Sequence, residues 1–157
     1  MNERHYGIAS AEEMAGMSGR EMLQAMIEGQ LPSPPISRTL DFRLVEVGDG
    51  RAAFEGEPSA DLFNPLGTVH GGWALTLIDS AAGCAAHSRL PAGVGYTTIE
   101  TKVNMTRAIT ADTGTVRAEG RVVAEGRRIV TTEARLLDGS GRILAHGTST
   151  IMVLPPR

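Results

Sequence analysis

Residues 64–72 read Asn-Pro-Leu-Gly-Thr-Val-His-Gly-Gly, and residues 73–87 continue as Trp-Ala-Leu-Thr-Leu-Ile-Asp-Ser-Ala-Ala-Gly-Cys-Ala-Ala-His. The second stretch is apolar around almost its whole circumference, which predicts a buried helix over residues 71–88. Two glycines at its start cost about 1 kcal/mol each relative to alanine within a helix, but they leave the backbone open to close approach. Since the first amides of a helix lack internal partners and its dipole attracts negative charge, this end is typical of an anion or oxyanion site.

The segments around this helix alternate apolar and polar residues, as strands do. Gly-Asp-Gly at 48–50 joins two such segments, residues 40–47 and 51–57, into a hairpin. Four more strands are expected at about 95–107, 113–125, 128–138 and 142–153, and we expect them to form an antiparallel meander. A single antiparallel sheet wrapped around one buried helix is the simplest architecture for this order, so the predicted fold class is α+β.

Residues 1–35 follow a different pattern from the rest of the chain. Capping-box sequences begin at Ser10 and Ser18, and Gly29 is expected to end the second of these helices. Leu-Pro-Ser-Pro-Pro at 31–35 predicts an extended linker. We therefore divide the chain into an N-terminal helical extension with its linker, residues 1–35, and a main domain, residues 36–157. The extension is interpreted as an amphipathic lid or packing helix.

Composition excludes several classes of protein. The net charge of −3, without a cluster of Lys and Arg, offers no surface for nucleic acid or an anionic membrane. The single cysteine, Cys84, cannot form an internal disulfide, and no Cys/His spacing of the zinc type occurs, so no metal site is expected. The N-terminus lacks the pattern of a signal peptide, and no apolar run is long enough to span a bilayer. We expect a soluble, cytoplasmic protein.

Asp79 is the carboxylate within the apolar helix, and burying a lone ionised carboxylate is costly unless it is paired or hydrated. It follows His70 by nine residues, which on a straight helix means a rise of about 13.5 Å and opposite faces. The two side chains therefore cannot act on one small group within a single chain. If both are functional, one subunit supplies His-Gly-Gly and another supplies Asp79, which predicts a two-fold dimer with two sites.

With Asn64, Gly67, His70, Gly71-Gly72 and Asp79 at this spacing, the chain resembles the hotdog-fold thioesterases of the phenylacetate-degradation (PaaI-like) type. The resemblance covers about residues 36 to 153. It implies a hotdog fold and hydrolysis of acyl- or aryl-coenzyme A thioesters, with sites shared between subunits of a dimer or a dimer of dimers. It implies no cofactor, because coenzyme A is part of the substrate.

The resemblance also implies roles for individual residues. Asp79 would be the general base or nucleophile, and the Gly71 N–H would polarise the thioester carbonyl. Asn64 would position water or thioester, His70 would orient the loop or contact the thioester, and Gly72 would take part in binding. A hydroxyl on the following strand is expected near the carboxylate, with Thr98 the first choice and Thr97 the alternative. Gly83 stands where some relatives carry a threonine, so any role of that threonine hydroxyl does not transfer to this chain.

Each of these residues also has a structural interpretation. Asn64 can cap a turn and His70 can satisfy loop carbonyls. Arg107 is interpreted as a solvated strand-end residue rather than a phosphate ligand, and Cys84 as an inert core thiol. A non-catalytic acyl-CoA-binding regulatory module and a hotdog enoyl-thioester hydratase are the alternative functions. The sequence leaves open which acyl group is preferred and whether coenzyme A or a carrier protein supplies the thiol. It also leaves open whether Asp79 acts as nucleophile or general base, and whether the protein is a dimer or a tetramer.

Overall fold

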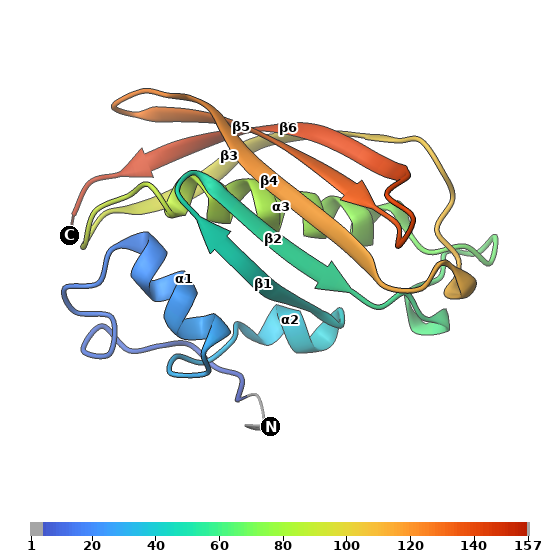
Figure 1. Ribbon diagram of the computed structural model, residues 1–157, viewed down its shortest axis with the longest axis horizontal. Helices are drawn as coiled ribbons and strands as arrows, with labels where there is room; N and C mark the ends of the chain where they lie inside the picture. The colour runs from blue at the N-terminus through green and yellow to red at the C-terminus, as the bar shows by residue number, and fades with distance from the viewer. Residues whose placement is uncertain (1–4, 157) are drawn as a thin grey trace.

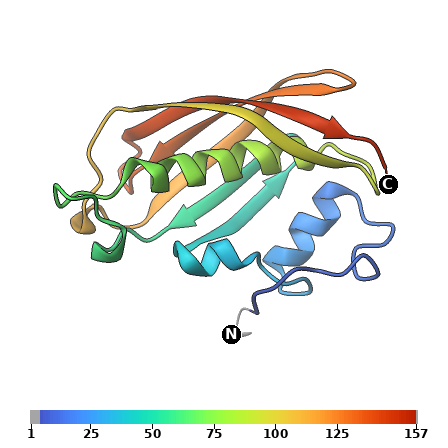
Figure 2. The same ribbon diagram turned by 180° about the vertical axis from the view of Figure 1, so that it is seen from behind.

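Six antiparallel strands form one sheet in the computed structural model, which describes residues 5–156. The strands are β1 (Phe42–Gly48), β2 (Arg51–Gly56), β3 (Gly95–Met105), β4 (Val116–Glu125), β5 (Ile129–Leu137) and β6 (Ile143–Leu154). Their order across the sheet is β1-β2-β4-β5-β6-β3. A long helix, α3 (Gly71–His87), lies lengthwise against one face of the sheet (Figures 1 and 2). The prediction of one sheet around a central helix is confirmed.

The core lies between α3 and the sheet. Leu77, Ile78, Ala81 and Ala85 of α3 are completely buried, as the all-round apolar pattern predicted. Gly120 of β4 lets the strand approach the helix closely, because a Cβ built there would lie 2.2 Å from the carbonyl oxygen of Ala81. Small residues on both elements thus fix the position of α3 over the middle of the sheet.

The expected four-strand meander is wrong at its first strand. β4, β5 and β6 do pair in sequence, but β3 pairs with β6 at the far edge, and β4 pairs with β2. Residues 106–115, which include the short 3-10 helix η2 (Ala111–Thr113), carry the chain from that edge to the middle of the sheet. Alternation in the sequence tells which residues share a face, not which strand is the neighbour. The consequence is that β3 is an edge strand.

Between residues 5 and 34, the N-terminal extension contains one regular helix, α1 (Gly19–Ile27), which lies beside β1 (Figure 1). Its capping box is present: the Glu21 N–H donates to the Ser18 hydroxyl, and the Ser18 N–H donates to the Glu21 carboxylate. Gly29, with a φ of 74°, follows the helix end as predicted. Ser10 makes the same reciprocal bonds with Glu13, but residues 11–16 form turns rather than a helix.

The proline linker is only partly extended. Ser33 pairs with Tyr6 in an isolated parallel bridge, whereas Pro35 begins a short helix, α2 (Pro35–Thr39). Proline is well suited to the first helical position, because an N–H there would have no acceptor within the helix. Within the described residues, no helix has the length and apolar character needed to cross a membrane.

Candidate active site

The loop before α3 places the His70 ring over the start of the helix. His70 is the N-cap, and its Nδ1 accepts a hydrogen bond from the Gly72 N–H at 2.9 Å. The Gly71 N–H donates to no acceptor among residues 5–156, as expected for the first amide of a helix. Of the two glycine amides, the one at Gly71 is therefore available to a ligand, while the one at Gly72 is occupied by the histidine.

Asn64 shapes this loop with both ends of its side-chain amide. Its Nδ2 donates to the Thr68 hydroxyl at 2.9 Å, and its Oδ1 accepts from the Leu66 N–H at 2.9 Å. The backbone N–H of Asn64 also donates to the Thr68 carbonyl at 2.7 Å. These contacts match the turn-capping interpretation. The catalytic role predicted for Asn64 stays a prediction.

Asp79 is half-buried on α3 and contacts a chain of hydroxyls on the sheet. The Thr101 hydroxyl donates to the Asp79 carboxylate at 3.2 Å, and the Thr101 oxygen is in turn in contact with the Ser149 hydroxyl. Ser149 also lies 3.2 Å from the Glu100 carbonyl oxygen. Because an ionised carboxylate can only accept, the Thr101 proton is directed to Asp79. The carboxylate is thus held by a polar network in an otherwise apolar helix.

The hydroxyl beside the carboxylate is that of Thr101, not of Thr98 or Thr97. A register shift between Thr98 and Glu100 inserts an extra residue into β3 and changes the facing of the residues before it, while Thr101 keeps its alternation with Val103. The sequence carries no signal for this bulge. Counting alternate residues back from Val103, which packs against the core, would have placed Thr101 on the helix side. The substrate-binding roles of Gly72, Thr97 and Thr98 stay predictions.

Beyond Asp79, Tyr96 of β3 lies against Gly83 and Cys84 of α3. A Cβ at Gly83 would lie 3.0 Å from the Tyr96 ring, so the ring fills the space beside this glycine. Burial raises the pKa of Cys84 to about 12. The neighbouring Cys84 and burial raise the pKa of Tyr96 well above its ordinary value. Both groups are therefore neutral at physiological pH, and Cys84 matches its interpretation as an inert thiol.

A cavity of about 320 Å³ adjoins the start of α3. Asn64, His70 and Gly71 form one side of it, and Met105 and Arg107 lie on another. Met105 also covers Gly71 closely, because a Cβ at Gly71 would lie 3.1 Å from the Met105 Cε. Arg107 is exposed at the end of β3. The free Gly71 amide is thus next to a space that can admit part of a ligand.

The predicted site residues form two groups within one chain. Asn64, His70 and Gly71 lie together at the start of α3, and Asp79 lies with Thr101 about two turns further along the helix. Both groups border the same edge strand, since Met105 and Thr101 both belong to β3. No three His, Cys, Asp or Glu side chains within residues 5–156 are grouped so that they could hold a metal ion.

Residues 66–145 match the family described as the thioesterase superfamily. The chain belongs to this family. It is 34% identical to a conserved protein of Pseudomonas aeruginosa, with 76% of this chain and 94% of that one covered and a TM-score of 0.71. A mutant of the phenylacetic acid degradation protein PaaI of Thermus thermophilus is 28% identical over 75% of this chain and 97% of its own, with a TM-score of 0.68.

A thioesterase family protein of Silicibacter pomeroyi is also similar, at 27% identity, with 84% of this chain and 98% of that one covered and a TM-score of 0.74. These findings confirm the hotdog fold and the likeness to PaaI-type thioesterases that residues 64–79 predicted. They support a hydrolase of the thioesterase type.

Proposed function

We propose that the protein is an acyl-CoA thioesterase, which hydrolyses acyl- or aryl-coenzyme A thioesters to the free acid and coenzyme A. The observation that carries this proposal is that two chemical groups of α3 both lie beside the edge strand β3. One is the Gly71 N–H, which has no acceptor among the described residues, and the other is the Asp79 carboxylate held by Thr101. A hydrogen-bond donor for a developing oxyanion and a carboxylate are the two groups that thioester hydrolysis needs.

In this proposal the thioester carbonyl oxygen accepts a hydrogen bond from Gly71, which stabilises the negative charge that develops during attack. Two routes use the same carboxylate. Asp79 takes a proton from water as the water attacks the carbonyl carbon, or it attacks the carbon itself and forms an anhydride that water then opens. In both, the carbon–sulfur bond breaks, and the thiolate of coenzyme A leaves and takes up a proton. Neither route requires a metal ion or an organic cofactor.

The site is proposed to be shared between two copies of the chain. The rise of about 13.5 Å between positions 70 and 79 of a helix is too long for one thioester carbonyl to meet both groups. Antiparallel pairing of β3 with β3 of a second copy would bring the helix start of each copy toward Asp79 of the other. The exposed side chains of Ile99 and Met105 on this edge, 53% and 50% accessible, support it. A dimer of dimers would use a different surface.

The test is thiol release from a panel of short, medium, long and aryl acyl-CoA substrates. We expect Asp79→Asn to lower kcat by about 10²- to 10⁴-fold, the usual contribution of a catalytic acid or base. Asp61→Asn, a change to an exposed carboxylate of the short 3-10 helix η1 (Ala60–Leu62), should leave kcat unchanged. Equal release by wild type and Asp79→Asn would contradict the proposal. Loss of 2-enoyl absorbance without thiol release would instead identify a hydratase, and tight binding without turnover a regulatory module.

A further inference from the structure

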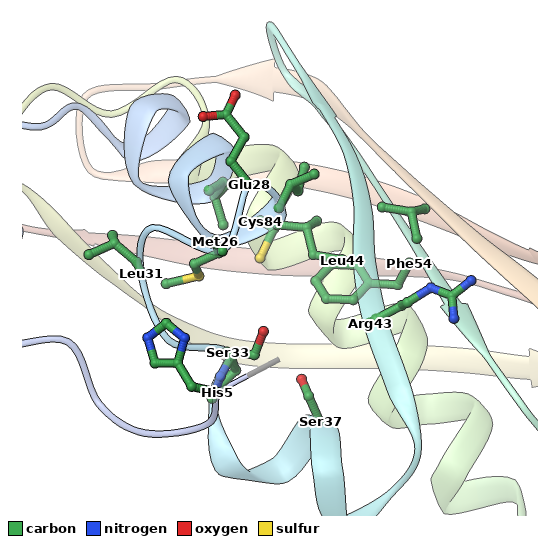
Figure 3. Close-up of a pocket in the computed structure, with 15 residues that line it drawn as sticks. His5, Met26, Glu28, Leu31, Ser33, Ser37, Arg43, Leu44, Phe54 and Cys84 are labelled. Atoms are coloured by element: carbon green, nitrogen blue, oxygen red, sulfur yellow. The ribbon is translucent and has the colours of Figure 1, made fainter. Parts of the chain in front are cut away.

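A second and larger cavity, of about 480 Å³, lies between the N-terminal extension and the main domain (Figure 3). Apolar side chains make up most of its lining. They come from α1, from the β1–β2 hairpin and from α3: Leu23, Met26, Ile27, Leu44, Phe54 and Cys84. Its size is within the range of small-molecule sites, about 300 to 1,000 Å³.

Among the lining residues that the structure describes, no charged side chain is directed into the middle of this cavity. Figure 3 shows the Glu28 carboxylate and the Arg43 guanidinium pointing away from its centre, where the side chains of Met26 and Cys84 lie. The Arg43 guanidinium is paired with Glu55 at 2.8 Å. Polar residues, His5, Ser33 and Ser37, gather on one side. The cavity therefore suits a neutral apolar group with a single polar margin.

The lining favours an aliphatic group over an aromatic one. Phe54 is already packed against Phe42, with ring centroids 5.9 Å apart and planes at 49°, so its ring is not free to stack on a ligand. Met26 and the leucines are flexible and fit a chain of variable shape. An aryl group would gain more from a pocket with free aromatic faces.

The cavity is connected with the proposed site through α3. Cys84 follows Asp79 by five residues, which is a rise of about 7.5 Å and a turn of about 140° around α3, so a chain that joins them has to pass around the helix. The Tyr96 ring, which would lie 3.0 Å from a Cβ at Gly83, borders the path between the two residues. A thioester whose carbonyl lies at Asp79 would therefore reach the cavity with a medium or long acyl chain that passes Tyr96, and not with a short one.

We propose that this cavity binds the acyl chain of the substrate, that α1 forms one wall of it, and that the preferred substrates are medium- or long-chain aliphatic thioesters. The inference rests on the thioesterase function proposed above. It assigns the N-terminal extension a part in substrate selection, since Leu23, Met26 and Ile27 belong to it.

The first test is kcat/KM along a series from butyryl- to hexadecanoyl-CoA, with phenylacetyl-CoA for comparison. Each methylene that enters the cavity should raise kcat/KM about four-fold, because burying one CH₂ group contributes about 0.8 kcal/mol. The increase should cease when the cavity is full. Phenylacetyl-CoA should react more slowly than the best aliphatic substrate.

Variants of α1 then test the wall directly. Met26→Trp fills the cavity and should lower kcat/KM for dodecanoyl-CoA at least ten-fold, with little change for butyryl-CoA. Met26→Ala enlarges it and should move the optimum to longer chains. Met22→Trp is the matched control, because Met22 lies one turn away on α1, is also half-buried, and lines the groove beside His87 and Tyr96 instead. It should keep the wild-type profile.

Direct binding separates failure of this inference from failure of the proposed function. Titration calorimetry with dodecanoate should show binding by the wild type and Met22→Trp, and at least ten-fold weaker binding by Met26→Trp. Hydrolysis with a flat chain-length profile, or a profile changed by Met22→Trp alone, would overturn the inference and leave the thioesterase intact. No thiol release from any substrate would overturn the function, and dodecanoate binding that Met26→Trp weakens would still support the cavity as a chain site.

Discussion

The Thr101 hydroxyl donates a hydrogen bond to the Asp79 carboxylate at 3.2 Å, across the space between β3 and α3. Its oxygen is also in contact with the Ser149 hydroxyl on β6. Two strands and the helix thus fix the direction in which the Asp79 carboxylate points. Positioning of this kind affects the rate of a reaction because catalytic groups must be held in productive geometry.

Thr101→Val should lower kcat for thioester hydrolysis about ten- to hundred-fold. The valine keeps the shape of the side chain but removes the donor, and a hydrogen bond to a charged group contributes about 1.5–3 kcal/mol. Thr101→Ser should retain most of the activity. Thr150→Val is a control, since it removes a comparable hydroxyl–carboxylate bond, to Glu100 at 3.1 Å, on the neighbouring strand. Equal rates for Thr101→Val and Thr150→Val would show that the contact has no catalytic role.

Ile99→Asp should convert a dimer into a monomer and abolish activity. The charge would be buried at the β3 edge that is proposed to pair with a second copy, where no partner for it is expected. Val123→Asp is the matched control, because Val123 on β4 is 56% exposed, close to the 53% of Ile99, but lies away from this edge. Light scattering after size-exclusion chromatography measures the mass. A Val123→Asp monomer, or an active monomeric Ile99→Asp, would contradict the shared site.

Much of the fold follows from local sequence. The apolar residues of 73–87 and the two glycines before them predict α3 almost to the residue, and the turn at Gly48–Gly50 predicts the first hairpin. Neighbouring strands could not be predicted in the same way, because β3 crosses to the far edge and alternation does not record pairing. The departure of Pro35 from the expected linker has a local cause, since proline also begins helices.

The candidate site likewise has features that local sequence predicts and others that it does not. The spacing of His70 and Asp79 predicts that they lie apart, and the structure confirms it within one chain. The partner of Asp79 was missed, because Thr98 and Thr97 followed from the resemblance rather than from the alternation along β3, which places Thr101 on the same face as Val103. The cavity beside Met26 could not be predicted from the sequence either, because three segments that are distant in the sequence form it.

Gly120→Ala should lower the free energy of unfolding by about 3 kcal/mol, at the upper end of the cost of overpacking a core. The new Cβ would lie 2.2 Å from the Ala81 carbonyl oxygen, which is backbone and cannot turn aside. Gly139→Ala provides the control, because no atom lies within 4 Å of the Cβ it would add. Urea unfolding followed by circular dichroism measures both. Similar stability of the two variants would mean that α3 and β4 are further apart than the structure shows.

His87 should make the protein less stable as the pH falls below about 6.5, the ordinary pKa of histidine. Burial beside Tyr96, with ring centroids 5.1 Å apart, lowers the pKa of His87 in the folded protein. In the unfolded chain the imidazole takes up a proton at a higher pH than in the folded protein. Acid therefore favours unfolding, and the stabilising contribution present above pH 6.5 is lost as the pH falls through the folded pKa.

The change to make is His87→Gln, with the free energy of unfolding of wild type and variant measured by urea at about pH 7.5 and about pH 5, on either side of the ordinary pKa. Other groups titrate in both proteins, so the difference between them isolates this histidine. The wild type should lose more stability than His87→Gln between the two pH values. Equal losses of unfolding free energy in the two proteins would show that the His87 ring is solvated at the end of α3. The contact of α1 with this end would then be looser than the close approach of Gly19 to His87 implies.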